Sequence, residues 1–113
     1  MTHYLISFPG EAMDVPAEEM PAVAAAAHAV AQEAKDAGVL VFAGGLLEAV
    51  EPVMVSGDGT VTPGTYPQTG EFSGGFTIVD VRSRQEALEW ARKIAAACRC
   101  GQELREFMDD PLD

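Results

Sequence analysis

The sequence predicts a single α+β domain made of two β-α-β units with a β-hairpin inserted between them. Three observations predict this fold. A chain of 113 residues fits one domain, taken here as residues 1–113. Strand-type and helix-type apolar patterns alternate along it, so the order reads strand, helix, strand, hairpin, strand, helix, strand. The strand before the second helix carries apolar residues on both faces, as in a sheet that is covered on both sides.

The first unit begins with residues 3–8, an alternating segment rich in β-formers that predicts a strand ending at Pro9–Gly10. A helix follows, announced by Asp14-Val15-Pro16, with apolar residues at helical spacing and a stop at Gly38. Residues 39–42 then predict a short strand of the buried type.

The middle of the chain predicts a hairpin and a long loop. Gly44–Gly45 indicates a bulge or a close backbone approach. Residues 51–56 and 60–62 form two strands around a turn at residues 57–59, which glycine favours. Residues 63–75 are polar and rich in turn formers, and loops of this length are usually functional or disordered.

The second unit starts with a strand at Phe76–Val81. Ser83 and Glu86 then form a capping box, which predicts a helix that runs to about Cys98. Residues 102–108 are the last strand, and residues 109–113 are expected to be a solvated tail.

Two β-α-β units with right-handed crossovers fold most simply as one four-stranded sheet with both helices on one face. The other face would be bare in a monomer, although the strands are apolar on both sides. The simplest cover is the same face of a second copy. The sequence therefore predicts a homodimer with two-fold symmetry.

Acidic residues outnumber basic ones, 18 to 7, and the net charge is −11. This argues against binding nucleic acid or an anionic membrane, because both need clustered Lys and Arg. No apolar run could cross a bilayer, and no basic segment precedes the first apolar stretch, so we expect a cytosolic protein. Cys98 and Cys100 lack a second Cys or His cluster, and we expect reduced thiols with no bound metal or cofactor.

Several segments spread over almost the whole length match one protein family in order and spacing. The closest is Gly74–Val81, with the sequence Gly-Gly-Phe-Thr-Ile-Val-Asp-Val. The others are Tyr4-Leu5-Ile6, Glu18-Glu19-Met20, Ala37-Gly38-Val39-Leu40 with Gly44-Gly45-Leu46, Glu86-Ala87-Leu88-Glu89-Trp90-Ala91, and Glu103-Leu104-Arg105. On these segments the chain resembles the YCII-related family, and within it the branch named for an Asp-Gly-Pro-Phe (DGPF) motif.

The resemblance implies a ferredoxin-like, dimeric α/β barrel, in agreement with the topology above, and it implies a pocket more firmly than a reaction. Where the branch has its naming motif, this chain has Pro63-Gly64-Thr65-Tyr66, so the acid is lost. Gln68 and Gly70 replace an acid and a lysine that often follow. Related proteins carry a His and an Asp proposed as a catalytic pair; His28 lies one residue out of register with that histidine, so the role is not carried over.

Five residues are candidates for a site. His28 is a candidate general base, since imidazoles titrate near neutrality, or else a boundary residue of the helix. Glu71 is a candidate acid or base, and Tyr66 could present its hydroxyl to a ligand or simply pack over apolar surface. Gly74 and Gly75 are candidate ligand-binding positions, against a structural role in a tight strand entry.

The predicted function is to bind a small molecule in a pocket at the dimer interface, with acid and base residues that could make it an enzyme. The alternative is a non-catalytic ligand-binding or regulatory dimer, and the sequence leaves this choice open. We expect residues 63–75 to cover the mouth of the pocket with Tyr66 pointing inward. The observation that separates the alternatives is whether His28, Tyr66 or a carboxylate converge in one concave site.

Overall fold

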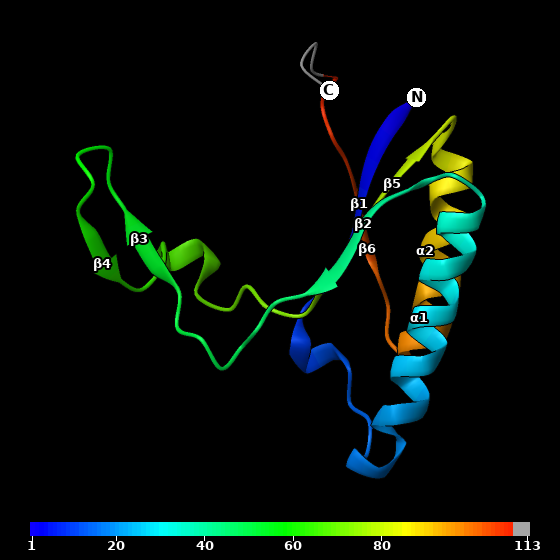
Figure 1. The fold of residues 1–113 in the computed structure, drawn as a ribbon, viewed down its shortest axis with the longest axis horizontal. Helices are drawn as coiled ribbons and strands as arrows, with labels where there is room; N and C mark the ends of the chain where they lie inside the picture. The colour runs from blue at the N-terminus through cyan, green and yellow to red at the C-terminus, as the bar shows by residue number, and fades with distance from the viewer. Residues whose placement is uncertain (110–113) are drawn as a thin grey trace.

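The computed structural model describes residues 1–109. Two helices lie on the same face of a four-stranded antiparallel sheet, and a two-stranded hairpin stands apart from this body (Figure 1). The sheet order is β2-β5-β1-β6. The elements are β1 (Thr2–Phe8), α1 (Met20–Asp36), β2 (Leu40–Gly45), β3 (Val53–Val55), β4 (Val61–Pro63), β5 (Gly75–Val81), α2 (Arg84–Cys98) and β6 (Glu103–Glu106).

The predicted α+β class, the element order and the placement of both helices on one face are confirmed. The arrangement of the two β-α-β units is compatible with a ferredoxin-like fold, since the first strand lies in the middle of the sheet between the third and the fourth strand of the body. No helix among residues 1–109 is long and apolar enough to cross a membrane.

Local signals set the helix ends. The backbone amide of Glu86 donates to the Ser83 hydroxyl at 3.2 Å, so the predicted N-terminal cap of α2 is confirmed. Helix α1 begins with Pro21 in its first turn, where a missing amide costs no hydrogen bond, and a short 3₁₀ turn, Ala17–Glu19, leads into it. Gly38 follows α1 with φ of 77°, as expected for a helix stop.

The hydrophobic core lies between the helices and the middle of the sheet. Its buried members are Tyr4, Ile6, Val79, Val81, Ala87 and Ala91. Every second residue of β1 and β5 contributes, because side chains alternate across a strand and the register pairs Tyr4 with Val79. Helix α2 supplies the helical part of this cluster, so the core is concentrated beneath α2 rather than α1.

The opposite side of the sheet, the open face, faces away from both helices (Figure 1). Its apolar members are Leu5, Phe42, Phe76 and Ile78, which the register places on neighbouring strands. Phe42 leaves 56% of its surface exposed. A covered sheet was predicted from the apolar residues on both faces of Phe76–Val81, and within the single chain helices cover one face only.

The segment from residue 47 to residue 70, the arm, contains β3 and β4 and extends away from the body on the side opposite the helices (Figure 1). Only Met54 and Gly64 within it are even partly buried. The predicted turn is formed as expected: the amide of Thr60 donates to the Asp58 carboxylate at 2.9 Å, and this hydrogen bond lowers the pKa of Asp58.

The two glycine pairs, Gly44–Gly45 and Gly74–Gly75, have different backbone surroundings. The bulge predicted at Gly44–Gly45 is wrong, because the register of β2 shifts between Leu40 and Phe42 instead. At Gly44 the approach is by a side chain, since a Cβ there would lie 2.8 Å from the Phe42 ring. Gly74 is the true close backbone approach: its φ is 91°, and a Cβ would lie 1.9 Å from the carbonyl oxygen of Phe8.

Candidate ligand-binding cavity

A cavity of about 490 Å³ lies between the helices and the sheet. Helix α1 and the preceding segment contribute Met13, Met20, Ala27, His28, Val30, Ala31 and Ala34; α2 contributes Trp90, Ile94 and Cys98. The strands and their flanks contribute Phe8, Gly10, Ala43, Gly44, Gly45, Gly74, Gly75, Phe76, Thr77 and Val79.

Small residues on both sides create this space. Ala27 and Ala31 lie one helical turn apart on α1, and Ala43, Gly45 and Gly75 lie on the strands that face them. Protein interiors are normally filled to crystal density, so short side chains on two opposed surfaces leave a gap unless the layers move together. The result is a pocket open to solvent on one side with largely apolar walls, the kind of site that binds small, largely apolar molecules.

The polar groups of the cavity are few. Of the residues that line it, His28 and Cys98 are the ones whose side chains titrate, and no carboxylate of the described residues is among them. His28 is largely exposed, so its imidazole lies at the edge. Cys98 is buried, and this burial, with a smaller contribution from Cys100, raises the pKa of its thiol. The thiol is therefore protonated near neutral pH and acts as a weak donor.

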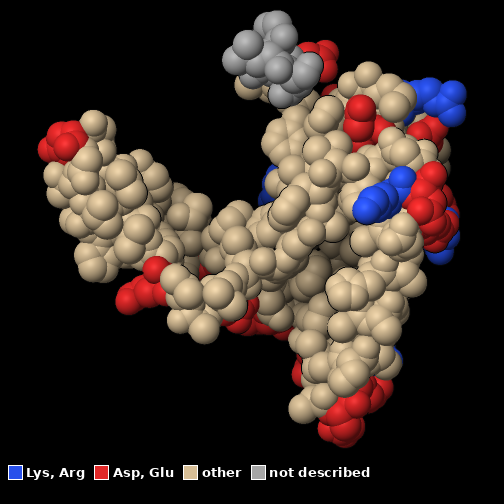
Figure 2. Space-filling model, in the orientation of Figure 1, with Lys and Arg blue, Asp and Glu red and all other residues tan. Residues whose placement is uncertain are grey.

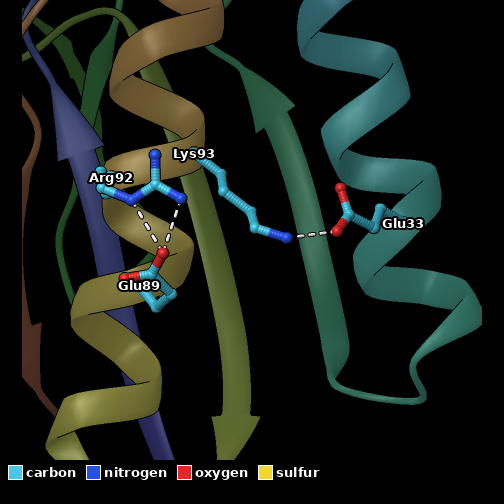
Figure 3. Close-up of polar contacts among 4 residues, drawn as sticks. All are labelled: Glu33, Glu89, Arg92 and Lys93. Carbon is cyan, nitrogen blue, oxygen red and sulfur yellow. Dashed lines mark hydrogen bonds and ion pairs between the residues drawn. The ribbon is translucent and has the colours of Figure 1, made fainter.

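An ion pair ties the two helices beside the cavity. Lys93 of α2 reaches across to the Glu33 carboxylate of α1, whereas Arg92 pairs with Glu89 within α2 (Figure 3). The Lys93 ammonium also lies 4.9 Å from the centre of the Trp90 ring, which lines the cavity. Exposed pairs of this kind contribute little stability. The Lys93–Glu33 pair matters here for the geometry of the cavity, because it links α1 to α2 next to the cavity wall.

A second, smaller hollow of about 230 Å³ lies at the end of the open face. Two carboxylates line it, Glu71 from the predicted loop and Glu103 from β6, together with the rings of Phe72 and Phe76. These two rings are 4.9 Å apart between centroids, so Phe72 packs the loop onto the sheet. The hollow is thus bounded by acidic and aromatic groups and is separated from the larger cavity by the sheet.

The structure separates the candidate residues. His28, Gly74 and Gly75 line the large cavity, and Glu71 lines the small hollow. Tyr66 lies on the arm, is 63% exposed and lines neither. The inward orientation expected for Tyr66 is therefore not formed within one chain, and its contact with a ligand stays a prediction.

Sequence reasoning missed a pair on the open face. The Nδ1 atom of His3 lies 3.7 Å from Oδ1 of Asp80, and that oxygen is buried without a hydrogen-bond partner among the described residues. Arg82 and Arg105 pair with other carboxylates, Arg82 with Glu86 at 3.5 Å and Arg105 with Glu103 at 3.4 Å. The pairing depends on the register of β1 against β5, which sets His3 opposite Asp80 and which no local sequence pattern gives.

The walls of the large cavity were also missed, although a signal existed. The alanine-rich stretch from residue 24 to residue 34 gives α1 a face with little volume, and the glycines near β2 and β5 do the same for the sheet. Read together, two low-volume surfaces on elements expected to pack predict a gap. Trp90 and Ile94 of α2 form one wall of this cavity.

A family model described as YCII-related domain matches residues 3–108. No curated protein matches the chain. The match covers nearly all of the chain and confirms the family resemblance, whereas assignment to the DGPF branch stays a prediction.

Proposed function

The chain belongs to the YCII-related family, and from the cavity between its helices and its sheet we propose that it binds a small, largely apolar molecule there. The observation that carries the proposal is the lining: alanine, glycine, aliphatic and aromatic groups surround about 490 Å³, with one imidazole at the edge. Ligand sites of small molecules typically have volumes of about 300–1,000 Å³, apolar walls and a few polar groups.

The polar groups suggest the chemistry of the ligand. His28 can donate or accept a hydrogen bond, and Thr77 offers a hydroxyl from the sheet side. A ring or chain carrying one carbonyl, hydroxyl or carboxylate would place its apolar part against Trp90 and Ile94 and its polar group toward His28. Such a ligand leaves no buried polar group without a partner.

Binding without catalysis is the better-supported role. General acid–base catalysis uses a side chain positioned for proton transfer, commonly with a second group that orients it. The candidate carboxylate, Glu71, lies on the other side of the sheet from His28. Within the large cavity, acid–base chemistry would therefore depend on His28 with no carboxylate among the residues that line it, and the ligand-binding or regulatory alternative needs no such partner.

The protein also forms a homodimer through its open faces, which would complete a dimeric α/β barrel. Leu5, Phe42, Phe76 and Ile78 support this proposal, because a second copy would remove their exposed apolar surface from water. The small hollow beside Glu71 would then lie at the dimer interface, where a pocket was predicted from the sequence. The larger cavity is preferred as the ligand site, since one chain by itself supplies largely apolar walls around it.

The chain has one tryptophan, Trp90, and its place in the cavity wall makes it a reporter. A panel of small aromatic and aliphatic acids, alcohols and ketones is screened by thermal shift and by Trp90 emission. A bound compound should raise the melting temperature and change the emission together.

Ala31→Phe, which fills the cavity, should abolish both signals. Ala25→Phe, on an exposed position of α1 that does not line the cavity, should leave them intact. A compound that binds Ala31→Phe as tightly as the wild type would contradict the assignment of the cavity. Replacement of His28 by Gln then tests the polar end: affinity should fall for hits with a polar group and stay constant for a pure hydrocarbon.

A further inference from the structure

The arm has an apolar face that the other described residues of the chain leave uncovered. Within the described residues β3 pairs with β4 alone, and a lone two-stranded hairpin is marginally stable in water. Val53, Val55 and Val61 share one face of the hairpin, because β3 and β4 pair Val55 with Val61 and Val53 with Pro63. These three valines are 54%, 67% and 58% exposed. Three β-branched apolar side chains thus form an uncovered stripe far from the core.

The size and the surface area of the chain indicate that a single copy leaves more surface exposed than a compact domain does. Its radius of gyration is 15.7 Å, against about 13 Å for a compact domain of this length. Its accessible surface is 7784 Å², about 1,800 Å² more than the roughly 6,000 Å² that size scaling gives for a compact monomer of this mass. A standard protein interface buries about 800 Å² on each partner. The surplus surface is therefore sufficient for an interface of full size.

The direction of the arm indicates which partner could cover its apolar face. The arm leaves the body on the side of the open face, opposite the helices, so the arm and the open face border one concave space (Figure 1). Figure 2 shows this space as a deep notch between the arm and the body. A second copy stacked on the open face by a two-fold axis would enter the notch, and symmetry would bring its own arm around the first copy.

The arm is acidic, and the open face carries charges of both signs. The arm carries Glu48, Glu51 and Asp58 and contains no Lys or Arg, and its visible side shows no basic side chain (Figure 2). Arg105 projects from β6 on the open face, since its neighbour Leu104 packs against the core, and it already pairs with Glu103 of the same strand at 3.4 Å. Charge therefore does not select the occupant of the notch, and the choice of a second copy depends on the direction of the arm and on the exposed apolar surface.

We propose that the arm clasps a second copy of this chain, with the stripe of Val53, Val55 and Val61 packed against the partner's body. The inference rests on the face-to-face dimer proposed above and adds a second contact to it. The arm then gains the apolar cover that the single chain does not provide, and Tyr66 at its base is carried toward the partner rather than toward its own cavity.

The test measures the dimer dissociation constant by sedimentation velocity. Replacing Val53, Val55 and Val61 together by Thr keeps β-branching and shape but adds hydroxyls to the stripe. The constant should rise by about tenfold or more, because each threonine hydroxyl would lose its hydration in the apolar contact without gaining a hydrogen-bond partner. Leu88→Gln, at an apolar position on α2 that is 43% exposed, should leave it unchanged within about twofold.

Two outcomes separate the proposals. A wild-type constant for the triple threonine variant overturns the clasp and leaves the face-to-face dimer standing. A wild-type protein that is monomeric at about 100 µM, far above the constants of standard interfaces, overturns the dimer and the clasp with it.

A second measurement reads the contact directly. A benzophenone amino acid placed at Val55 is irradiated in a mixture with an affinity-tagged copy of the chain. A covalent dimer should form from this position and not from the same group placed at Lys35, which is exposed on α1. Cross-linking in a lysate to a different protein, with none to the tagged copy, would overturn the proposal.

Discussion

Replacing Gly74 by Ala tests whether this position serves the fold or a ligand. The backbone φ at Gly74 is 91°, and a Cβ would lie 1.9 Å from the carbonyl oxygen of Phe8 and 2.8 Å from the amide nitrogen of Gly10. Both are backbone atoms and cannot rotate away. The strained φ costs about 1–3 kcal/mol for a residue with a Cβ, and the overlap adds about 1–3 kcal/mol as overpacking does.

The expected loss for Gly74→Ala is therefore about 2–6 kcal/mol, a large part of the roughly 5–15 kcal/mol that holds a domain folded. Urea unfolding followed by Trp90 emission measures it. Gly101→Ala is the matched control: no atom lies within 4 Å of the added Cβ and its φ is not in the left-handed region, so its stability should stay level or rise slightly. A Gly74→Ala protein within about 0.5 kcal/mol of the wild type would refute the reasoning, since no ligand role alone requires glycine there.

Three further predictions follow from the core, the helix cap and the cavity. Ile6→Ala should cost about 2–5 kcal/mol in urea unfolding, because Ile6 is fully buried. Ser83→Ala should cost about 1 kcal/mol in the same assay through loss of the bond from the Glu86 amide. Cys98 should react with iodoacetamide at pH 8 more slowly than free cysteine and faster as the pH rises, because burial raises its thiol pKa and only the thiolate attacks. A ligand in the cavity should slow Cys98 further, and equal rates with and without ligand would argue against the site.

Much of the fold was predictable because its signals are local. The alternation at residues 3–8 and the Ser83 cap depend on a few neighbouring residues, and the structure forms both. Strand entry at Gly74–Gly75 was predicted as tight, and the close approach of Phe8 confirms it. Errors came where partners are distant: the β2 bulge falls at Leu40–Phe42 because its register is set against β5, not by the Gly44–Gly45 sequence.

The candidate site was predictable only in pieces. His28, Gly74 and Gly75 were selected for separate reasons, and packing of α1 over the sheet brings them to one cavity. Glu71 was selected for the same pocket, but in the structure it lines the small hollow on the other side of the sheet. Sequence spacing says which face of its own element a residue occupies, and it does not say how far two packed layers stay apart.

By itself the sequence determined the α+β class, the order of the elements, the family and the positions that need glycine, because propensity, periodicity and steric limits act over a few residues. Tertiary structure alone decided the volume between α1 and the sheet, the pairing of His3 with Asp80 and the course of the arm. Each of these depends on register and on the distance between layers. The register and the distance are set by many weak contacts between residues far apart in the chain. No local sequence pattern reports such contacts.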